Sequence, residues 1–146
     1  MRIPLYRGRR ATGLATIEIG NTLAGLPVIE TWVQTAALDG FGLLPQFIKI
    51  DVEGHELAVL RGAAETLERN HPAILVEAEE RHRPGAVASV ADFLRHLGYH
   101  GRFPWRREWL PIEQFEPTVH QSPDVPDALG RMNGGYAGMF VFRPLC

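Results

Sequence analysis

The central part of the chain has the most regular pattern of apolar and polar positions. Residues 47–51 (FIKID) form a short, mostly apolar run that ends in an acid, and residues 73–77 (AILVE) form a second run of the same kind. Between them, apolar residues recur at spacings of three and four, which is typical of an amphipathic helix over residues 55–69. The pattern therefore predicts a strand, a helix and a second strand in succession.

A second helix and a third strand follow along the chain. Apolar residues at helical spacing predict a helix over residues 87–97, and Gly98 is suited to end it in a left-handed conformation. Residues 99–103 are expected to form the third strand. Strands that alternate with helices are typical of a parallel sheet with covering helices, so the predicted fold class is α/β. A run as continuously apolar as residues 73–77 also indicates burial on both faces of that sheet.

The two ends of the chain are less regular. Glycines and prolines interrupt the first part, where short strands are expected around residues 3–6 and 14–19, and residues 28–34 (VIETWVQ) alternate like a half-exposed strand. Near the other end, residues 138–142 (GMFVF) are expected to form a last strand. We therefore expect one incomplete domain in three parts: short strands and irregular chain (1–35), a βαβαβ core (36–103), and a long loop with a final strand (104–146).

Composition limits the classes of protein to which the chain can belong. Apolar residues make up 45% of the 146 positions, which is enough for a buried core and argues against intrinsic disorder. The formal net charge of -2 argues against a nucleic-acid partner. No apolar run is long enough for a membrane helix, so no membrane association is expected. The single cysteine, Cys146, fits a reducing compartment, and we expect a cytoplasmic protein.

An arginine- and aromatic-rich stretch lies at residues 102–111 (RFPWRREWLP). Such interleaving can stack bases and hold phosphates. The chain has no net positive charge to support that function, however. A cap over the acceptor pocket is preferred to nucleic-acid binding, and a plain packed surface loop is preferred to both.

Two of the predicted strands end in carboxylates, Asp51 and Glu77, and Glu53 comes just after the first. In open α/β sheets, ligands bind beyond the carboxyl ends of the strands. If these two strands are parallel, the acids emerge at one edge, beside the start of the helix that follows Gly54. Simpler roles stay open: Asp51 as a helix cap, Glu53 as an acid favoured by the helix dipole, Glu77 as a solvated loop residue and His55 as a surface residue.

The cluster of Asp51, Glu53, His55 and Glu56 also raises the question of a divalent metal, which would suit a metal-dependent hydrolase. Hard cations need several convergent oxygens. Residues two positions apart across a strand-to-helix turn need not converge. We therefore expect no metal site, and metal-dependent hydrolysis is the weaker alternative.

The run over residues 47–77 (FIKIDVEGHELAVLRGAAETLERNHPAILVE) resembles the signature stretch of FkbM-type methyltransferases. That family shows K-I-D-V-E-G-x-E after an apolar strand, then L-x-x-L-x-G-A, then a strand that ends P-x-I-L-x-E. These elements stand here at residues 49–56, 57–63 and 72–77. The resemblance is specific over this stretch.

A looser similarity extends over residues 28–99. Ala37-Leu38-Asp39 resembles the family's T-L-D element with alanine in place of threonine, and residues 93–99 (FLRHLGY) resemble its late helix and L-x-x-x-G-Y exit. The resemblance implies a doubly wound, Rossmann-like methyltransferase sheet with helices on both faces. In that sheet residues 47–51 and 73–77 would be the fourth and fifth strands, and the last strand would be antiparallel.

One part of the family's pattern is missing. Its cofactor half carries a glycine-rich turn after the first strand, and an acid after the second strand for the ribose hydroxyls. The four glycines between residues 8 and 25 are scattered and form no G-x-G-x-x-G, and Asn133-Gly134-Gly135 comes too late. We therefore expect a partial sheet without the first strands and the glycine-rich turn, and no cofactor-binding residue can be assigned.

The resemblance implies transfer of a methyl group from S-adenosylmethionine to a hydroxyl oxygen of a sugar or natural product. It places Asp51 in the methyl-transfer site, with Glu53 and His55 as alternates for the general base or an acceptor contact, and Glu77 and Glu56 on the substrate side. Because the cofactor half is missing, we expect the chain alone to bind S-adenosylmethionine poorly and to be inactive. The competing hypothesis is a non-catalytic remnant that serves as a binding or assembly module.

A partial sheet also has a consequence for association. Without a first strand beside residues 47–51, one edge of that strand carries unpaired backbone groups, which favours pairing with another chain. We expect self-association or pairing through this edge, unless the strand at residues 28–34 covers it.

Overall fold

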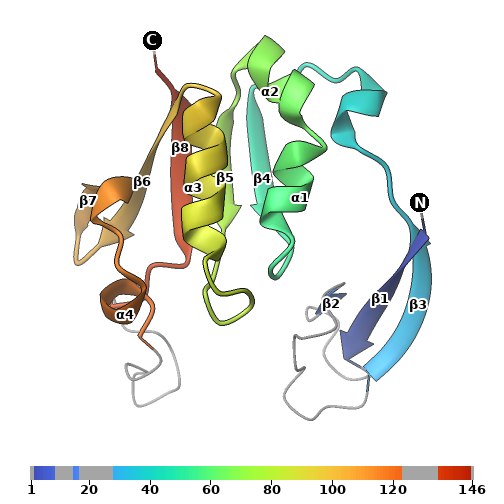
Figure 1. The fold of residues 1–146 in the computed structure, drawn as a ribbon, viewed down its shortest axis with the longest axis horizontal. Coiled ribbons are helices and arrows are strands. Elements are labelled where there is room, and N and C mark those ends of the chain that lie inside the picture. Colours follow the sequence, from blue (N-terminus) through green and yellow to red (C-terminus); the bar gives the residue numbers. More distant parts are fainter. Residues whose placement is uncertain (1, 9–14, 17–27, 123–134, 146) are drawn as a thin grey trace.

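The computed structural model describes residues 2–8, 15–16, 28–122 and 135–145, and these residues form two sheets (Figure 1). The smaller sheet is antiparallel, in the order β2-β1-β3, and consists of β1 (Arg2–Gly8), β2 (Ala15–Thr16) and β3 (Val28–Gln34). The larger sheet has the order β4-β5-β8-β6-β7 and consists of β4 (Phe47–Asp51), β5 (Ala73–Glu77), β6 (Tyr99–Trp105), β7 (Glu108–Pro111) and β8 (Met139–Pro144).

The directions of the strands confirm an α/β fold with a mixed sheet, consistent with the predicted partial Rossmann-like sheet. β4 and β5 are parallel neighbours, and β8 lies antiparallel between β5 and β6. The antiparallel last strand that the family resemblance implied is therefore present. The fold class is α/β, with β4 at one edge of the sheet and β7 at the other.

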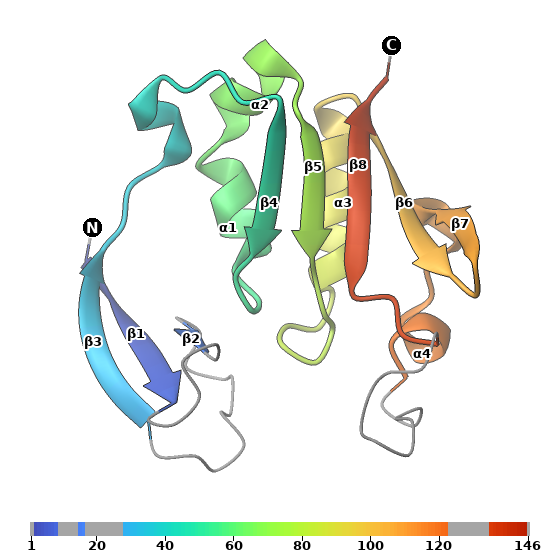
Figure 2. The ribbon, with the colours of Figure 1, turned by 180° about the vertical axis from the view of Figure 1, so that it is seen from behind.

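The three longer helices lie on one face of the larger sheet, as the two opposite views show (Figures 1 and 2). A right-handed connection from β4 to β5 and another from β5 to β6 place them there. The helical segments are α1 (Glu56–Arg61), α2 (Ala64–Asn70), α3 (Ala86–His96), α4 (Pro117–His120) and the 3-10 turns η1 (Leu38–Phe41) and η2 (Ile112–Gln114).

The single helix predicted over residues 55–69 is in fact two helices with a break at Gly62 and Ala63. Asp39, on η1, stabilises this break through hydrogen bonds to Gly62 and to the first turn of α2. Its backbone N–H donates to the carbonyl of Gly62 at 3.0 Å, and its carboxylate accepts the backbone N–H groups of Thr66 at 2.8 Å and Glu65 at 3.2 Å. Asp39 therefore caps α2 in place of Ala63, whose side chain cannot accept a hydrogen bond.

The ionisation of Asp39 follows from this cap. Partial desolvation acts to raise its pKa, but the hydrogen bonds from Thr66 and Glu65 outweigh it, so that the pKa of Asp39 lies below its usual value. The carboxylate form is the one that caps the helix. The aspartate of the Ala37-Leu38-Asp39 element therefore has a structural role.

The core lies between the larger sheet and its helices. Strand register brings Ile50, Val76 and Phe140 into one buried row, and Ile74 and Phe142 into the next. Gly101 continues the second row on β6 and leaves room for the ring of Phe142.

The opposite face of the sheet differs from the prediction of burial on both faces for residues 73–77. Leu75 is only partly buried, and Phe47 and Met139 are 57% and 49% exposed on this open face. The described residues place all three longer helices on the other face (Figure 2).

Two further expectations need correction. The stretch from residue 104 was expected to be a long irregular loop, but residues 102–111 form the hairpin of β6 and β7, which is followed by η2 and α4. This hairpin lies at the edge of the sheet opposite β4, so it is no cap over the ends of β4 and β5. Residues 14 and 17–19 of the predicted second strand, and Asn133 and Gly134, lie outside the described residues.

The strand at residues 28–34 does not cover the edge of β4. It forms β3, which pairs with β1 over seven residues in the smaller sheet. Among the described residues, β5 is the only strand that pairs with β4.

The close contact at Gly101 gives a direct test of the core. A β-carbon at this position would lie 2.4 Å from a ring atom of the buried Phe142, so the packing around it would have to shift. We expect Gly101→Ala to lower the free energy of unfolding by about 1–3 kcal/mol, measured by chemical denaturation. Gly138→Ala is the matched control, because its nearest neighbour would be at an ordinary 3.5 Å. Equal stability of the two variants would contradict this packing.

Candidate functional site

The carboxyl ends of β4 and β5 bring two predicted site residues together. The strands are parallel and in register, with Asp51 directly beside Glu77. Lys49, on the same face of β4, places its Nζ 2.7 Å from Oδ2 of Asp51. Two carboxylates therefore lie side by side at the edge formed by the carboxyl ends of β4 and β5, which we call the carboxylate rim. The ammonium group of Lys49 forms an ion pair with one of them, Asp51.

The turn from β4 into α1 adds two more acids. Glu53 has a φ of 54° and Gly54 a φ of 103°, so the chain turns through two successive residues with positive φ. Such a conformation is unusual for a glutamate and is maintained only when the surroundings hold it. Glu56 supplies part of that hold, because its Oε1 accepts the backbone N–H of Gly54 at 2.7 Å.

Glu56 and His55 occupy different positions relative to this turn. Glu56 is only 2% exposed, and its carboxylate faces the turn that it stabilises. His55 is the N-cap residue of α1, where its carbonyl accepts the backbone N–H groups of Ala58 and Val59. Its side chain does not line the recess described below.

The loop after β5 supplies residues that the sequence analysis did not single out. Nε2 of His82 lies 2.7 Å from Oε2 of Glu53 and 4.0 Å from Oε1 of Glu79. His82 therefore links the turn after β4 with the loop after β5. This contact gives a structural reason for the strained conformation of Glu53.

Glu79 is nearly buried and has two strong partners. The hydroxyl of Tyr136 donates a short hydrogen bond to it, and Arg81 contacts both of its carboxylate oxygens, with Nε 2.5 Å from Oε2. Burial, and then the hydrogen bond to Glu79, raise the pKa of Tyr136 well above its usual value. The phenol thus stays protonated and continues to donate.

Gln121, on the segment after α4, fixes the backbone around this loop. Its side-chain amide donates to the carbonyls of Ala78 at 2.7 Å and Ala137 at 2.8 Å, and its Oε1 accepts the N–H of Glu80 at 2.8 Å. A buried amide with these three bonds is well satisfied and costs little to bury. It holds the end of β5 to the segment that leads into β8.

The electrostatics of the rim are dominated by carboxylates. Burial raises the pKa of Glu77, and the neighbouring charges of Asp51, Glu79 and Glu53 raise it further. A carboxylate with a raised pKa is a stronger base, which suits a group that accepts a proton.

A narrow recess lies among these side chains and has no interior room for a water-sized sphere. A substrate would therefore sit over the rim. Within the described residues, no group of three His, Cys, Asp or Glu side chains is arranged to hold a metal ion. The recess is lined by Asp51, Glu53, Glu56, Glu77, Glu79 and His82.

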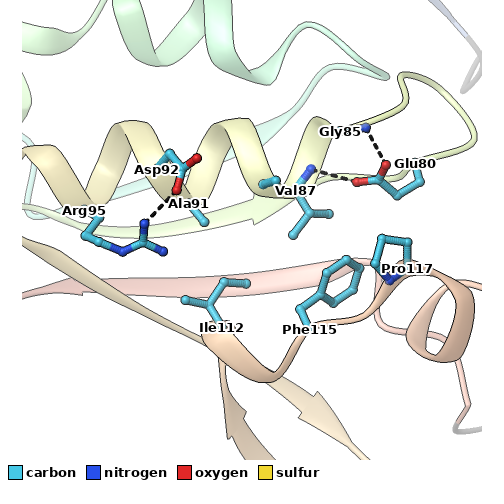
Figure 3. Close-up of a pocket in the computed structure, with 10 residues that line it drawn as sticks. Glu80, Gly85, Val87, Ala91, Asp92, Arg95, Ile112, Phe115 and Pro117 are labelled. Carbon is cyan, nitrogen blue, oxygen red and sulfur yellow. Dashed lines mark hydrogen bonds and ion pairs between the residues drawn. The ribbon is translucent and has the colours of Figure 1, made fainter.

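A larger recess, with a volume of about 210 Å³, lies between α3 and the segment of η2 and α4 (Figure 3). Its polar groups already bond to one another. Glu80 accepts the backbone N–H groups of Gly85 at 2.5 Å and Val87 at 3.1 Å, and Arg95 pairs with Asp92 at 2.6 Å. This recess is separate from the carboxylate rim, and we assign it no role.

The residues that sequence reasoning missed are Glu79, His82, Gln121 and Tyr136. The polar run after β5, EERH, was a signal, because loops at the carboxyl ends of strands line ligand sites. Gln121 and Tyr136 gave no signal, since they contact the loop after β5 from segments that lie far along the chain.

The raised pKa of Glu77 predicts a pH-dependent effect on stability. Because ionisation is harder in the folded state, the fold loses stability as pH rises through the pKa of Glu77. Glu77→Gln stays neutral, so we expect it to have a higher midpoint of thermal unfolding than the unaltered chain at about pH 7, with the difference vanishing below about pH 4. Glu68→Gln, an exposed change on α2, is the control. A lower midpoint for Glu77→Gln at neutral pH would contradict the prediction.

Comparison with known proteins supports the assignment to a family. No helix in the described part of the chain is long and apolar enough to cross a membrane. Residues 9–100, more than half of the 146 residues, match the family described as Methyltransferase FkbM domain. No curated protein and no solved structure matched. The chain therefore belongs to the FkbM methyltransferase domain family.

Proposed function

We propose that the rim at the ends of β4 and β5 serves methyl transfer from S-adenosylmethionine to a hydroxyl oxygen of a small molecule, such as a sugar or natural product. Membership of a methyltransferase family supports the type of reaction. The observation that carries the proposal is the register of Asp51 beside Glu77 at the carboxyl ends of parallel strands. Ligands of open α/β sheets bind at this position.

The charge of the rim fits the cofactor. When bound, S-adenosylmethionine supplies a methyl group on a positively charged sulfonium. Asp51, Glu53 and Glu77 present negative charge where that cation would lie, and this attraction favours binding. The described residues contain no glycine-rich turn between a first strand and a helix, so they offer few contacts to the remainder of the cofactor.

The residues of the rim can orient the acceptor and take up its proton. Asp51 is 41% exposed and is held by Lys49, so it can accept a hydrogen bond from an acceptor hydroxyl. An acceptor held in line and at attack distance gains several kcal/mol over a free one, and a positioned base adds about 100-fold. Glu53 and His55 are the alternates for the base.

The substrate side of the site is proposed to include Glu77 and Glu56. The raised pKa of Glu77 suits it to share a proton with an acceptor hydroxyl. Glu56 acts through the turn, since its carboxylate holds Gly54 and thereby fixes the position of Glu53. We propose a cytoplasmic setting, which the single cysteine, Cys146, supports.

A non-catalytic binding or assembly module is the second candidate. The observation that favours it is the open face of the larger sheet, where Phe47 and Met139 are exposed. Soluble domains rarely expose contiguous apolar surface without a binding role. The two candidates make different predictions for cofactor binding and for catalysis.

The first prediction concerns the cofactor. Because the described residues supply the rim without a glycine-rich turn, we expect the chain alone to bind S-adenosylmethionine more weakly than about 100 μM, roughly -5.5 kcal/mol. Isothermal titration calorimetry measures this directly. Tighter binding would mean that the chain holds a cofactor site that the proposal lacks.

The second prediction concerns catalysis. The chain from Gln46 onward would be joined to the cofactor-binding half of a complete FkbM-domain methyltransferase. Transfer of tritiated methyl groups to hydroxyl acceptors is then expected, and Asp51→Asn should lower kcat about 100-fold. The cofactor affinity of this variant should change little.

Asp92→Asn, an exposed change on α3, is the matched control and should leave kcat unaltered. A chimera that binds the cofactor but methylates no hydroxyl acceptor would contradict the proposal and favour the binding module.

A further inference from the structure

Among the described residues, β4 is the edge strand of the larger sheet beside the carboxylate rim. β4 has five residues, and β5 is its only strand partner among the described residues. The unpaired N–H and C=O groups of an edge strand are a template for another strand. What can pair here depends on the side chains that β4 presents on each face.

The two faces of β4 carry different chemistry. On the open face, Lys49 and Asp51 are exposed, with 51% and 41% of their side-chain surface accessible. On the helix-covered side, Ile48 of β4 and Val52, the first residue after the strand, are only partly buried, although they contact the core. An incoming strand would therefore meet one cation, one anion and the exposed ring of Phe47 on one face, and incompletely covered apolar groups on the other.

The order of these residues is complementary to itself. If two copies of β4 pair antiparallel about Ile50, Lys49 of each copy lies opposite Asp51 of the other. Ile48 then lies opposite Val52, and Ile50 opposite its own copy. Directly opposed side chains in an antiparallel pair are about 4.5–5.5 Å apart at Cβ, so opposite charges attract there.

Other registers lose this match. Pairing about Lys49 sets the two lysines against each other, and a shift by one residue turns the apolar side chains of one copy to the open face. A lysine on an edge strand usually discourages pairing with arbitrary strands. Here it admits a partner that presents a carboxylate at the opposing position, which selects the register about Ile50.

We propose that two copies of this chain associate through an antiparallel pairing of β4 with β4, centred on Ile50 and selected by the Lys49 and Asp51 charges. The pairing joins the two larger sheets into one and covers Ile48 and Val52 of both copies. It also occupies the edge beside the carboxylate rim. This inference does not depend on the reaction proposed above.

The N-terminal sheet offers another route to association. Among the residues that the structure describes, β3 pairs only with β1 and so lies at the edge of its sheet, and Trp32 on it is 56% exposed. β3 carries no lysine or arginine and has one acid, Glu30, so it lacks the self-complementary pair that β4 has. A β3-mediated contact is therefore treated as an outcome of the test.

The test uses charge reversal and mixing of full-length variants, with mass measured by sedimentation equilibrium. Lys49→Asp and Asp51→Lys each place like charges opposite one another in the paired strands. Each variant alone is expected to dissociate at least about tenfold more readily than the unaltered chain. An equimolar mixture of the two should dimerise again, because every opposed pair is then of opposite charge.

The mixture separates the proposed contact from a folding effect. Both single variants lack the Lys49–Asp51 contact within the chain, so recovery on mixing can come only from contacts between chains. The double variant Lys49→Asp/Asp51→Lys keeps the pair in reversed order. The double variant should self-associate like the unaltered chain but should not form mixed dimers with the unaltered chain. It replaces the single variants in the test if one of them fails to fold.

Two control variants complete the design. Asp92→Lys reverses one charge of a comparable exposed pair on α3 and should not change the association. Trp32→Glu should likewise leave it unchanged. A monomer at all concentrations, a dimer insensitive to both charge reversals, or a dimer abolished by Trp32→Glu would overturn the proposal.

Discussion

The parallel pairing of β4 with β5, in the register that sets Asp51 beside Glu77, is the constraint on which the candidate site depends. It brings two acids from separate strands to one rim. Carboxylates placed so close repel one another, and the pKa of Glu77 is raised partly for this reason. The structure offsets the repulsion with Lys49 on β4 itself and with groups from the segments after β5 and before β8, namely Arg81, His82 and the hydroxyl of Tyr136. The carboxylate rim is a candidate functional site despite this repulsion, because acids with perturbed pKa values cluster at functional sites.

Much of the larger sheet could be predicted from the sequence, because its pattern is local. The runs FIKID and AILVE and the stripe over residues 87–97 led directly to β4, β5 and α3. The strand-end acids followed from a general rule for parallel sheets. The split of the first helix could not be predicted in this way, since Asp39 caps α2 from 25 or more residues away in sequence. The placement of β3 beside β1 was likewise beyond pattern reasoning, because an alternating strand does not specify its partner.

The candidate site was only partly predictable for the same reason. Asp51, Glu53 and Glu77 were marked by their positions at strand ends, whereas His82 reaches Glu53 only because two loops converge. Glu56 was assigned to the substrate side, and in the structure its carboxylate faces the turn and bonds to Gly54. The continuous apolar pattern of residues 73–77 indicates a cover on both faces, yet the described residues cover one. That difference, together with the open edge of β4, is the physical basis for expecting a partner.

The coupling between Asp51 and Glu77 is the most direct measure of this account. Nuclear magnetic resonance can follow the side-chain carboxyl of Glu77 during an acid titration, in the unaltered chain and in Asp51→Asn. If the two acids share a rim, the pKa of Glu77 is raised in the first and moves toward its ordinary value in the second, because one neighbouring negative charge is gone. An identical pKa in both proteins would contradict the shared rim and, with it, the proposed site.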